Sequence, residues 1–176
     1  MAVVATGFFD GVHLGHKAVV SELVSLAAAC SSQSLVVTFW PHPRKVLGAD
    51  GDGMLLLCSK EEREEMLRAL GVSRIETLEF TREFASLTCR EYIEEILVGR
   101  FGASHLVVGY DNRMGSDSLG AEQIASLCRE LSLGCTIVPP VFYDGTEISS
   151  TRIRRAIASG DKKTAERMLG RSLQEF

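Results

Sequence analysis

Apolar residues follow two alternating patterns along this chain: short unbroken runs, and longer stretches with helical spacing. Residues 2–5 and 34–40 are short runs of the kind that form buried strands. Between them, residues 17–30 place apolar side chains along one face of a helix. A strand, a helix and a second strand at this spacing predict a right-handed parallel crossover. The pattern therefore indicates an α/β protein.

The same alternation continues to the end of the chain. Further strands are expected at 74–80, 105–110 and 135–139, with an extension at 141–143, and helices at 60–70, 88–100, 119–133, from about 148 and at 161–169. Ser59 and Thr88 precede two of these helices, each with a glutamate three positions later, as in a capping box. We predict a doubly wound, Rossmann-like parallel sheet of about five strands in the order 3-2-1-4-5. This order brings the loops after the first and fourth strands together at a switch point.

The turn after the first strand, residues 6–16, reads Thr-Gly-Phe-Phe-Asp-Gly-Val-His-Leu-Gly-His. Its glycines let the backbone approach a ligand, and the first N–H groups of a helix have no partner within it, so the turn is predicted to bind phosphate. His13 and His16 lie one helical turn apart, so both rings can face the same anion. Two alternatives remain. The histidines could merely cap a helix, or they could form a zinc pair, for which no nearby cysteine or carboxylate cluster completes a tetrahedral set.

Three later segments add polar chemistry where strands end or a helix begins. The stiff loop 41–43, Pro-His-Pro, leaves the second strand at the end where open α/β sheets bind ligands, although alone it also fits a simple turn. Residues 109–115 place an acid, an amide and a guanidinium after the fourth strand. Residues 148–154 offer three hydroxyl groups at a helix start, where an ordinary N-cap needs one. With the exposed N–H groups, these hydroxyls can hold an anion.

Composition limits the partners. At 176 residues with 45% hydrophobic content, the chain predicts one globular domain. A net charge of -4 offers no basic face for nucleic acid, so an anionic ligand must be held by local geometry. No apolar run approaches membrane-spanning length and no signal peptide is evident, so we expect a cytoplasmic protein without a membrane partner.

The cysteines and an acidic loop carry no predicted chemistry. The five cysteines are scattered and form no CxxC pair, which favours reduced thiols that serve as small buried hydrophobes. The glycine-rich segment 48–53 lacks EF-hand spacing, so a solvated loop is favoured over a cation site.

Taken together, these motifs resemble those of the HxGH nucleotidyltransferases. The longer form with Phe9-Asp10-Gly11, the Phe-x-Pro-His-Pro segment at 39–43 and the Ile-Ser-Ser-Thr-x-Ile-Arg segment at 148–154 are similar to the adenylyltransferase module of bacterial bifunctional riboflavin kinase/FAD synthetases. Residues 109–115 resemble that family's Gly-x-Asp-Phe-x-Phe-Gly motif. Asn112 and Met114 stand where the family usually carries phenylalanine, a departure that could weaken flavin packing or shift substrate choice.

The resemblance implies a domain of the HxGH nucleotidyltransferase type over residues 1–170 that transfers AMP from ATP to FMN, giving FAD and pyrophosphate. Residues 171–176 would begin the junction to an absent riboflavin kinase domain, the further partner in a longer parent chain. Mg²⁺ would accompany ATP, and no residue is assigned to a metal, although Asp10 and Asp111 are candidates for orienting ligands. No riboflavin kinase activity is expected from this chain.

The resemblance also assigns the site residues. The implied catalytic residues are His13, His16, Ser149, Thr151 and Arg154. The implied ATP-binding residues are Gly7, Phe8, Phe9, Asp10, Gly11, His13, Gly15, His16, Gly109, Ser149, Ser150, Thr151 and Arg154, and the implied FMN-binding residues are Pro41, His42, Pro43, Asp111, Asn112 and Arg113.

Two alternatives to this activity stay open. One is another HxGH nucleotidyltransferase with a different phosphorylated acceptor, such as pantetheine phosphate or glycerol phosphate, against which the Pro-His-Pro and Ile-Ser-Ser-Thr segments argue. The other is a flavin- or nucleotide-binding module without turnover.

Overall fold

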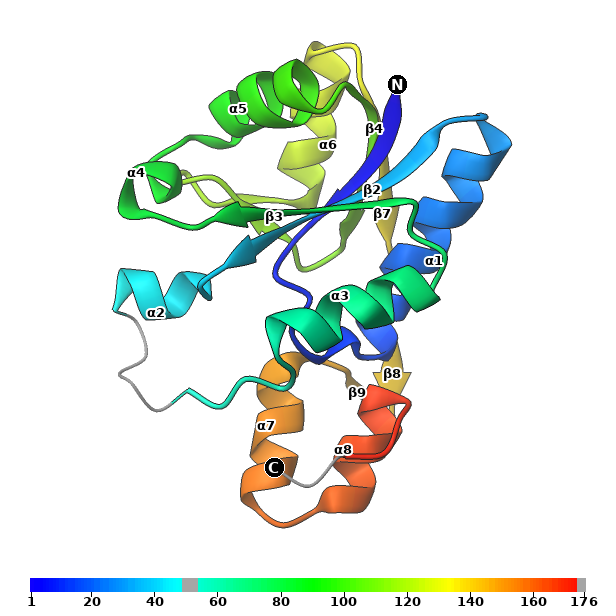
Figure 1. Ribbon diagram of the computed structural model, residues 1–176, viewed down its shortest axis with the longest axis vertical. Coiled ribbons are helices and arrows are strands. Elements are labelled where there is room, and N and C mark those ends of the chain that lie inside the picture. The colour runs from blue at the N-terminus through cyan, green and yellow to red at the C-terminus, as the bar shows by residue number, and fades with distance from the viewer. Residues whose placement is uncertain (49–53, 174–176) are drawn as a thin grey trace.

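The computed structural model describes residues 1–48 and 54–173 and is built around a parallel sheet (Figure 1). Its five strands run in the order β3-β2-β1-β4-β7, and every neighbouring pair is parallel. The bounds are β1 Ala2–Thr6, β2 Gln33–Trp40, β3 Arg74–Glu79, β4 Ala103–Gly109 and β7 Gly134–Val138. The predicted order 3-2-1-4-5 is confirmed, with β7 as the fifth strand of the sheet. The switch point therefore lies between β1 and β4, where the glycine-rich turn begins.

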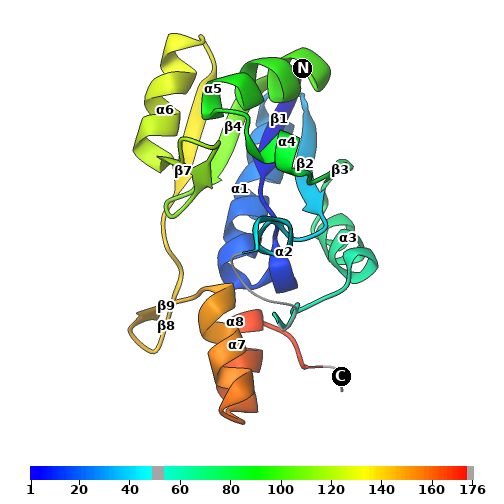
Figure 2. The same cartoon turned by 90° about the vertical axis from the view of Figure 1, so that its left-hand side faces the viewer.

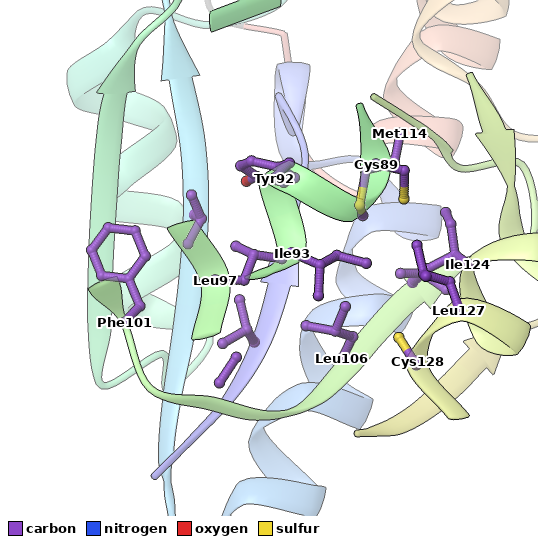
Figure 3. Close-up of a cluster of buried hydrophobic side chains, with 14 of the residues drawn as sticks. Cys89, Tyr92, Ile93, Leu97, Phe101, Leu106, Met114, Ile124, Leu127 and Cys128 are labelled. Atoms are coloured by element: carbon purple, nitrogen blue, oxygen red, sulfur yellow. The ribbon is translucent and has the colours of Figure 1, made fainter. Parts of the chain in front are cut away.

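Helices cover both faces of the sheet because alternate strand residues point to opposite sides. In β1, Val3 and Ala5 pack in one apolar cluster with α1 (Leu14–Ala29) and α3 (Lys60–Ala69). Ala2 and Val4 pack in the other, with the helical segment 89–100 and α6 (Ala121–Glu130). Figure 3 shows this second cluster, with Ile93, Leu97 and Leu106 among its labelled side chains. Both faces of β1 are thus buried, and the strand can offer ligands only its carboxyl end.

Several helices differ in detail from the expected ones. Helix α1 starts at Leu14, three residues earlier than expected, because His13 serves as its N-cap. The expected helix 88–100 is a short α-helix, α5 (Cys89–Glu91), that continues as a π-helix over Tyr92–Arg100. Two short helices, α2 (Pro43–Leu47) and α4 (Arg82–Ala85), were not expected. The two predicted capping boxes, at Ser59 and Thr88, are both present.

The C-terminal part forms a separate packing unit beyond the carboxyl ends of the strands. A hairpin of β8 (Phe142–Tyr143) and β9 (Thr146–Glu147) leads into α7 (Ser150–Ala158) and α8 (Lys162–Leu169). Both views show α7 and α8 side by side below the sheet (Figures 1 and 2). They share a third apolar cluster that includes Leu57, Ile148, Ile153, Met168 and Leu169. A second small hairpin joins β5 (Arg113–Met114) and β6 (Leu119–Gly120).

The cysteines are all free thiols. Cys58, Cys89 and Cys128 are buried as expected and Cys135 is half-buried, but Cys30 is exposed at the end of α1, so the expectation of a buried hydrophobe was wrong there. Of the predicted loop 48–53 only Gly48 lies within the described residues, and of the predicted junction 171–176 only residues 171–173. No helix within residues 1–48 and 54–173 has the length and apolar character needed to cross a bilayer.

Candidate active site

Two adjoining cavities open at the carboxyl end of β1. The first has a volume of about 340 Å³ and is bounded by the glycine-rich turn, the end of β4 and the start of α7. It brings together Gly7, Phe8, Phe9, Asp10, His13, Gly15, His16, Gly109, Ser149, Ser150, Thr151 and Arg154. The structure therefore places in one cavity every residue of the expected ATP-binding set except Gly11.

Gly11 has a structural place instead. It lies in a short 3₁₀ turn, η1 (Asp10–Val12), with a φ of +78°, and its N–H donates a hydrogen bond to the Cys58 Sγ at 3.1 Å. A Cβ at this position would lie 2.8 Å from the Leu57 Cβ. The residue lets the turn press against the segment before α3, and it is absent from the lining of the first cavity.

Gly11→Ala is expected to lower the free energy of unfolding by about 2–3 kcal/mol, because it adds a steric overlap to an unfavourable backbone conformation. Gly145→Ala is the matched control: its φ is +67°, but a Cβ there meets nothing within 4 Å. We expect about 1 kcal/mol for this control. Urea unfolding of both variants measures the difference, and equal losses would contradict the packing role.

His13 and His16 form a stacked pair at the start of α1. Their ring centroids lie 3.6 Å apart with an interplanar angle of 17°. The backbone N–H of His16 donates to the His13 Nδ1 at 3.3 Å, so the proton of a neutral His13 ring lies on Nε2, where it can be donated to a ligand. Burial lowers the pKa of His13 to about 4 and holds the pKa of His16 well below 6.5. At neutral pH both rings are therefore uncharged, and each carries one N–H that can donate a hydrogen bond.

The zinc alternative for this pair finds no support in the part of the chain that the structure describes. Over those residues no group of three or more histidine, cysteine, aspartate or glutamate side chains could hold a metal ion. The capping alternative is true of His13, whose side chain caps α1, but His13 also lines the cavity.

The buried histidines predict how stability depends on pH. The unfolded chain binds protons as the pH falls through 6.5, whereas folded His13 resists protonation down to about pH 4. Stability is therefore fully present above pH 6.5 and falls between pH 6.5 and 4, by roughly 3 kcal/mol for His13 alone. Burial raises the pKa of Asp10, which opposes this trend. Urea unfolding at pH 7.5 and 5 checks the loss, and His13→Gln should reduce it; an equal loss in this variant would contradict the assignment.

Asp10 and Arg154 form a largely buried ion pair in the wall of the first cavity. Asp10 is 3% exposed; its Oδ1 accepts a hydrogen bond from the Leu57 N–H at 2.9 Å, and its Oδ2 is paired with the Arg154 Nη2. The Arg154 Nε donates to the Leu55 carbonyl oxygen at 2.7 Å. The guanidinium is thus held from two sides, and its side chain, 17% exposed, also lines the cavity. The contacts of Asp10 make it the residue that orients Arg154.

The three hydroxyl groups at the start of α7 have different partners. The Ser149 Oγ accepts a hydrogen bond from the Arg152 N–H at 3.3 Å and caps the helix. The Ser150 Oγ donates to the carbonyl oxygen of Asp10 at 3.1 Å, which joins α7 to the glycine-rich turn. Thr151 is exposed and lines the cavity. Because the N-terminus of α7 faces the same cavity as the histidines, the first cavity combines several groups suited to phosphate oxygens.

The second cavity is larger, about 550 Å³, and one part of its lining is a group of aromatic side chains. Phe39, Phe80, Phe84 and Tyr92 line it and contact one another with ring centroids 5.5–6.3 Å apart. Tyr92 belongs both to the apolar core and to this cavity: it is 4% exposed, its hydroxyl lies 2.7 Å from the Thr6 Oγ1, and its side chain lines the cavity. A flat, partly apolar ligand matches this surface.

The residues expected to bind FMN are divided between the cavities. Pro43, Asp111, Asn112 and Arg113 line the second cavity, His42 lines the first, and Pro41 is absent from the lining of both. Asn112 also donates a hydrogen bond to the Thr6 carbonyl oxygen at 3.4 Å. Buried Met114 lines the second cavity beside the aromatic rings, so apolar surface remains at this departure from the family motif.

The two cavities adjoin and share part of their lining, which we call the shared wall. Thr6, Gly7, Phe8, Asp111 and Asn112 line both of them, and all five lie at the carboxyl ends of β1 and β4. A ligand in one cavity can therefore meet a ligand in the other across these residues. The first cavity also includes Arg44 and Tyr110, which sequence reasoning did not single out.

Comparison with known proteins supplies an independent line of evidence. A family model described as FAD synthetase matches residues 1–152. The bifunctional riboflavin kinase/FMN adenylyltransferase of Bacillus subtilis is 32% identical over 169 residues, which cover 96% of this chain and 53% of that protein. The FAD synthetase of Listeria monocytogenes is 33% identical over 171 residues, which cover 96% of this chain and 68% of that protein. The chain spans about half the length of most of the curated relatives it matches.

Solved structures agree on the fold. A Streptococcus pneumoniae protein described as a macrolide-efflux protein has a TM-score of 0.87 and 35% identity, covering 98% of this chain and 57% of that one. The pantoate-beta-alanine ligase of Francisella tularensis has a TM-score of 0.58 at 14% identity, covering 99% of this chain and 72% of that one, which is a likeness of fold alone.

Proposed function

Because the chain belongs to the FAD synthetase family, we propose that it transfers AMP from ATP to FMN and releases FAD and pyrophosphate. The observation that carries this proposal is the pair of cavities with a common wall. One cavity offers phosphate-binding groups and the other an aromatic surface, as a reaction between a nucleoside triphosphate and a flavin phosphate requires.

ATP would occupy the first cavity. Its triphosphate would lie between the His13–His16 pair and the start of α7, where the neutral imidazoles donate hydrogen bonds and Arg154 supplies positive charge. Mg²⁺ would enter with ATP, held mainly by phosphate oxygens and water.

FMN would occupy the second cavity, with its ring system among Phe80, Phe84 and Tyr92. Its phosphate would then point to the shared wall at Gly7 and Asn112, toward the first cavity. In this arrangement the polar loop 109–115 lies at the shared wall, where it can orient the FMN phosphate. The aromatic surface for the flavin ring comes from other segments.

The reaction needs alignment more than proton transfer. A phosphate oxygen of FMN attacks the α-phosphorus of ATP, and the bond from that phosphorus to the α,β-bridging oxygen breaks, so pyrophosphate leaves with the electron pair. The attacking oxygen is already ionised at neutral pH, so no general base is required. The site contributes by holding the two phosphates in line and by stabilising negative charge on the phosphoryl and leaving oxygens.

A product assay tests the proposal. The protein is incubated with FMN, ATP and Mg²⁺, FAD and pyrophosphate are quantified, and riboflavin replaces FMN in a parallel reaction. We expect equal amounts of FAD and pyrophosphate from FMN, and no FMN from riboflavin. Binding of ATP without FAD formation would overturn the proposal, and transfer to pantetheine phosphate or glycerol phosphate would identify a different acceptor.

We also place the reaction in the cytoplasm, where the five free thiols stay reduced.

A further inference from the structure

Arg63 is a fully buried cation that the proposed reaction does not use. It lies in α3 and is 0% exposed. Its Nη2 donates to the carbonyl oxygen of Phe39 at 3.1 Å, while Nε and Nη1 have no hydrogen-bond partner among the described residues. Among the residues that the structure describes, no carboxylate forms an ion pair with this guanidinium. A buried cation without such a partner is costly, so its position requires an explanation.

The guanidinium packs against an aromatic side chain of the shared wall. The Arg63 Cζ lies over the Phe8 ring, 4.2 Å from its centroid, and 5.8 Å from the centroid of Trp40. Phe8 in turn contacts His42, with ring centroids 4.1 Å apart, and stacks on Trp40 at 6.5 Å. Cations over aromatic rings are attracted most strongly where water is excluded, as it is here.

Two of the residues that Arg63 contacts line the cavities, although Arg63 itself lines neither. Phe8 belongs to both cavities and Phe39 to the second, and His42, which Phe8 contacts, belongs to the first. Holding the Phe8 ring in place therefore holds part of the shared wall between the two cavities in place. The Arg63 side chain reaches the shared wall from α3, a helix that contributes no lining residue to either cavity.

We propose that Arg63 is a positioning residue for the flavin acceptor: it holds the Phe8 ring in the shared wall so that the phosphate of the acceptor meets the α-phosphorus of ATP. This inference rests on the proposed function. Arg63 acts through Phe8, and its planar guanidinium matches the ring face and the Phe39 carbonyl oxygen together, which a lysine ammonium cannot do.

Steady-state kinetics of Arg63→Met and Arg63→Lys test the proposal, with Arg68→Met as the matched control. Arg68 lies on the same helix, but its side chain is 60% exposed and forms a surface ion pair with Glu64. We expect Arg63→Met to raise the KM for FMN about tenfold and to change the KM for ATP less than twofold. Arg63→Lys should raise the KM for FMN by about threefold, and Arg68→Met should leave both values unchanged.

A double variant tests whether Arg63 acts through Phe8. Phe8→Ala removes the ring, so adding Arg63→Met to it should change the KM for FMN less than twofold further. If the effects of Arg63→Met and Phe8→Ala on the KM for FMN multiply in the double variant, the proposal is overturned. Equal rises in the KM values for FMN and ATP, or wild-type kinetics in a folded Arg63→Met protein, would also overturn it. If Arg63→Met does not fold, Arg63→Lys with and without Phe8→Ala decides the same comparison.

The sole tryptophan gives a readout that does not need turnover. Trp40 is the one tryptophan of the chain and lies next to both Phe8 and Arg63. Without any ligand, Arg63→Met should red-shift its emission and increase its quenching by acrylamide, whereas Arg68→Met should not. An unchanged emission would overturn the positioning role. If the wild type forms no FAD, the proposed function fails, and the emission still reports whether Arg63 fixes the ring.

Discussion

Asp10→Asn is expected to lower kcat about 100-fold and the free energy of unfolding by roughly 3 kcal/mol. The amide keeps the hydrogen bond from the Leu57 N–H but removes the charge that holds Arg154. Breaking a buried ion pair from one side typically costs 3–5 kcal/mol because the other charge is left without its partner. The remaining exposure of Arg154 places the expected value at the lower end. The loss in kcat corresponds to a misplaced phosphate-binding group.

Initial rates of FAD formation and urea unfolding measure these two effects. Asp144→Asn is the control, since Asp144 is an exposed residue in the turn between β8 and β9. It should leave both quantities near their wild-type values. A stable Asp10→Asn protein with normal kcat would show that Arg154 needs no buried partner.

His16→Ala is expected to raise the barrier to AMP transfer by about 2–4 kcal/mol, which lowers kcat by about 30- to 900-fold. His16 lines the first cavity and stacks on His13, so its removal takes away one preorganised donor and the support of a second. The effect should fall mainly on kcat, because negative charge on the phosphoryl oxygens grows in the transition state.

The matched control for this variant is His105→Ala. His105 lies in β4 at the end opposite the site, where its Nε2 is 2.8 Å from the Thr136 Oγ1. Single-turnover rates for both variants separate the chemical step from product release. Near-normal turnover in His16→Ala would remove the proposed role of this ring.

The parts of the fold that the sequence predicted correctly depend on local patterns. The apolar runs of β1 and β2 and the spacing of α1 repeat with the periods of their elements, so order and topology followed from general rules. The candidate phosphate-binding segments could also be picked out, because the glycine-rich turn and residues 149–151 carry their polar groups in consecutive positions, and the structure brings both segments to one cavity.

Other parts could not be predicted because they depend on contacts between distant segments. Nothing around Arg63 distinguishes it from the exposed charges of α3, and only the folded chain places it over Phe8. The aromatic lining of the second cavity comes from four separate segments, at residues 8, 39, 80–84 and 92, which meet only in the folded chain. The π-helix over Tyr92–Arg100 has no signal in apolar spacing of the usual helical period.

The position of the first cavity between two packing units has a dynamic consequence. Its histidines lie at the start of α1, which packs on the sheet, whereas Thr151 and Arg154 lie in α7, which packs with α8 in an apolar cluster of its own. A bound triphosphate would tie these units together and add to the contacts of Asp10 with Ser150 and Arg154. Amide hydrogens of α7 should then exchange with solvent more slowly when ATP is present, while those in the middle of β1 should exchange at the same rate.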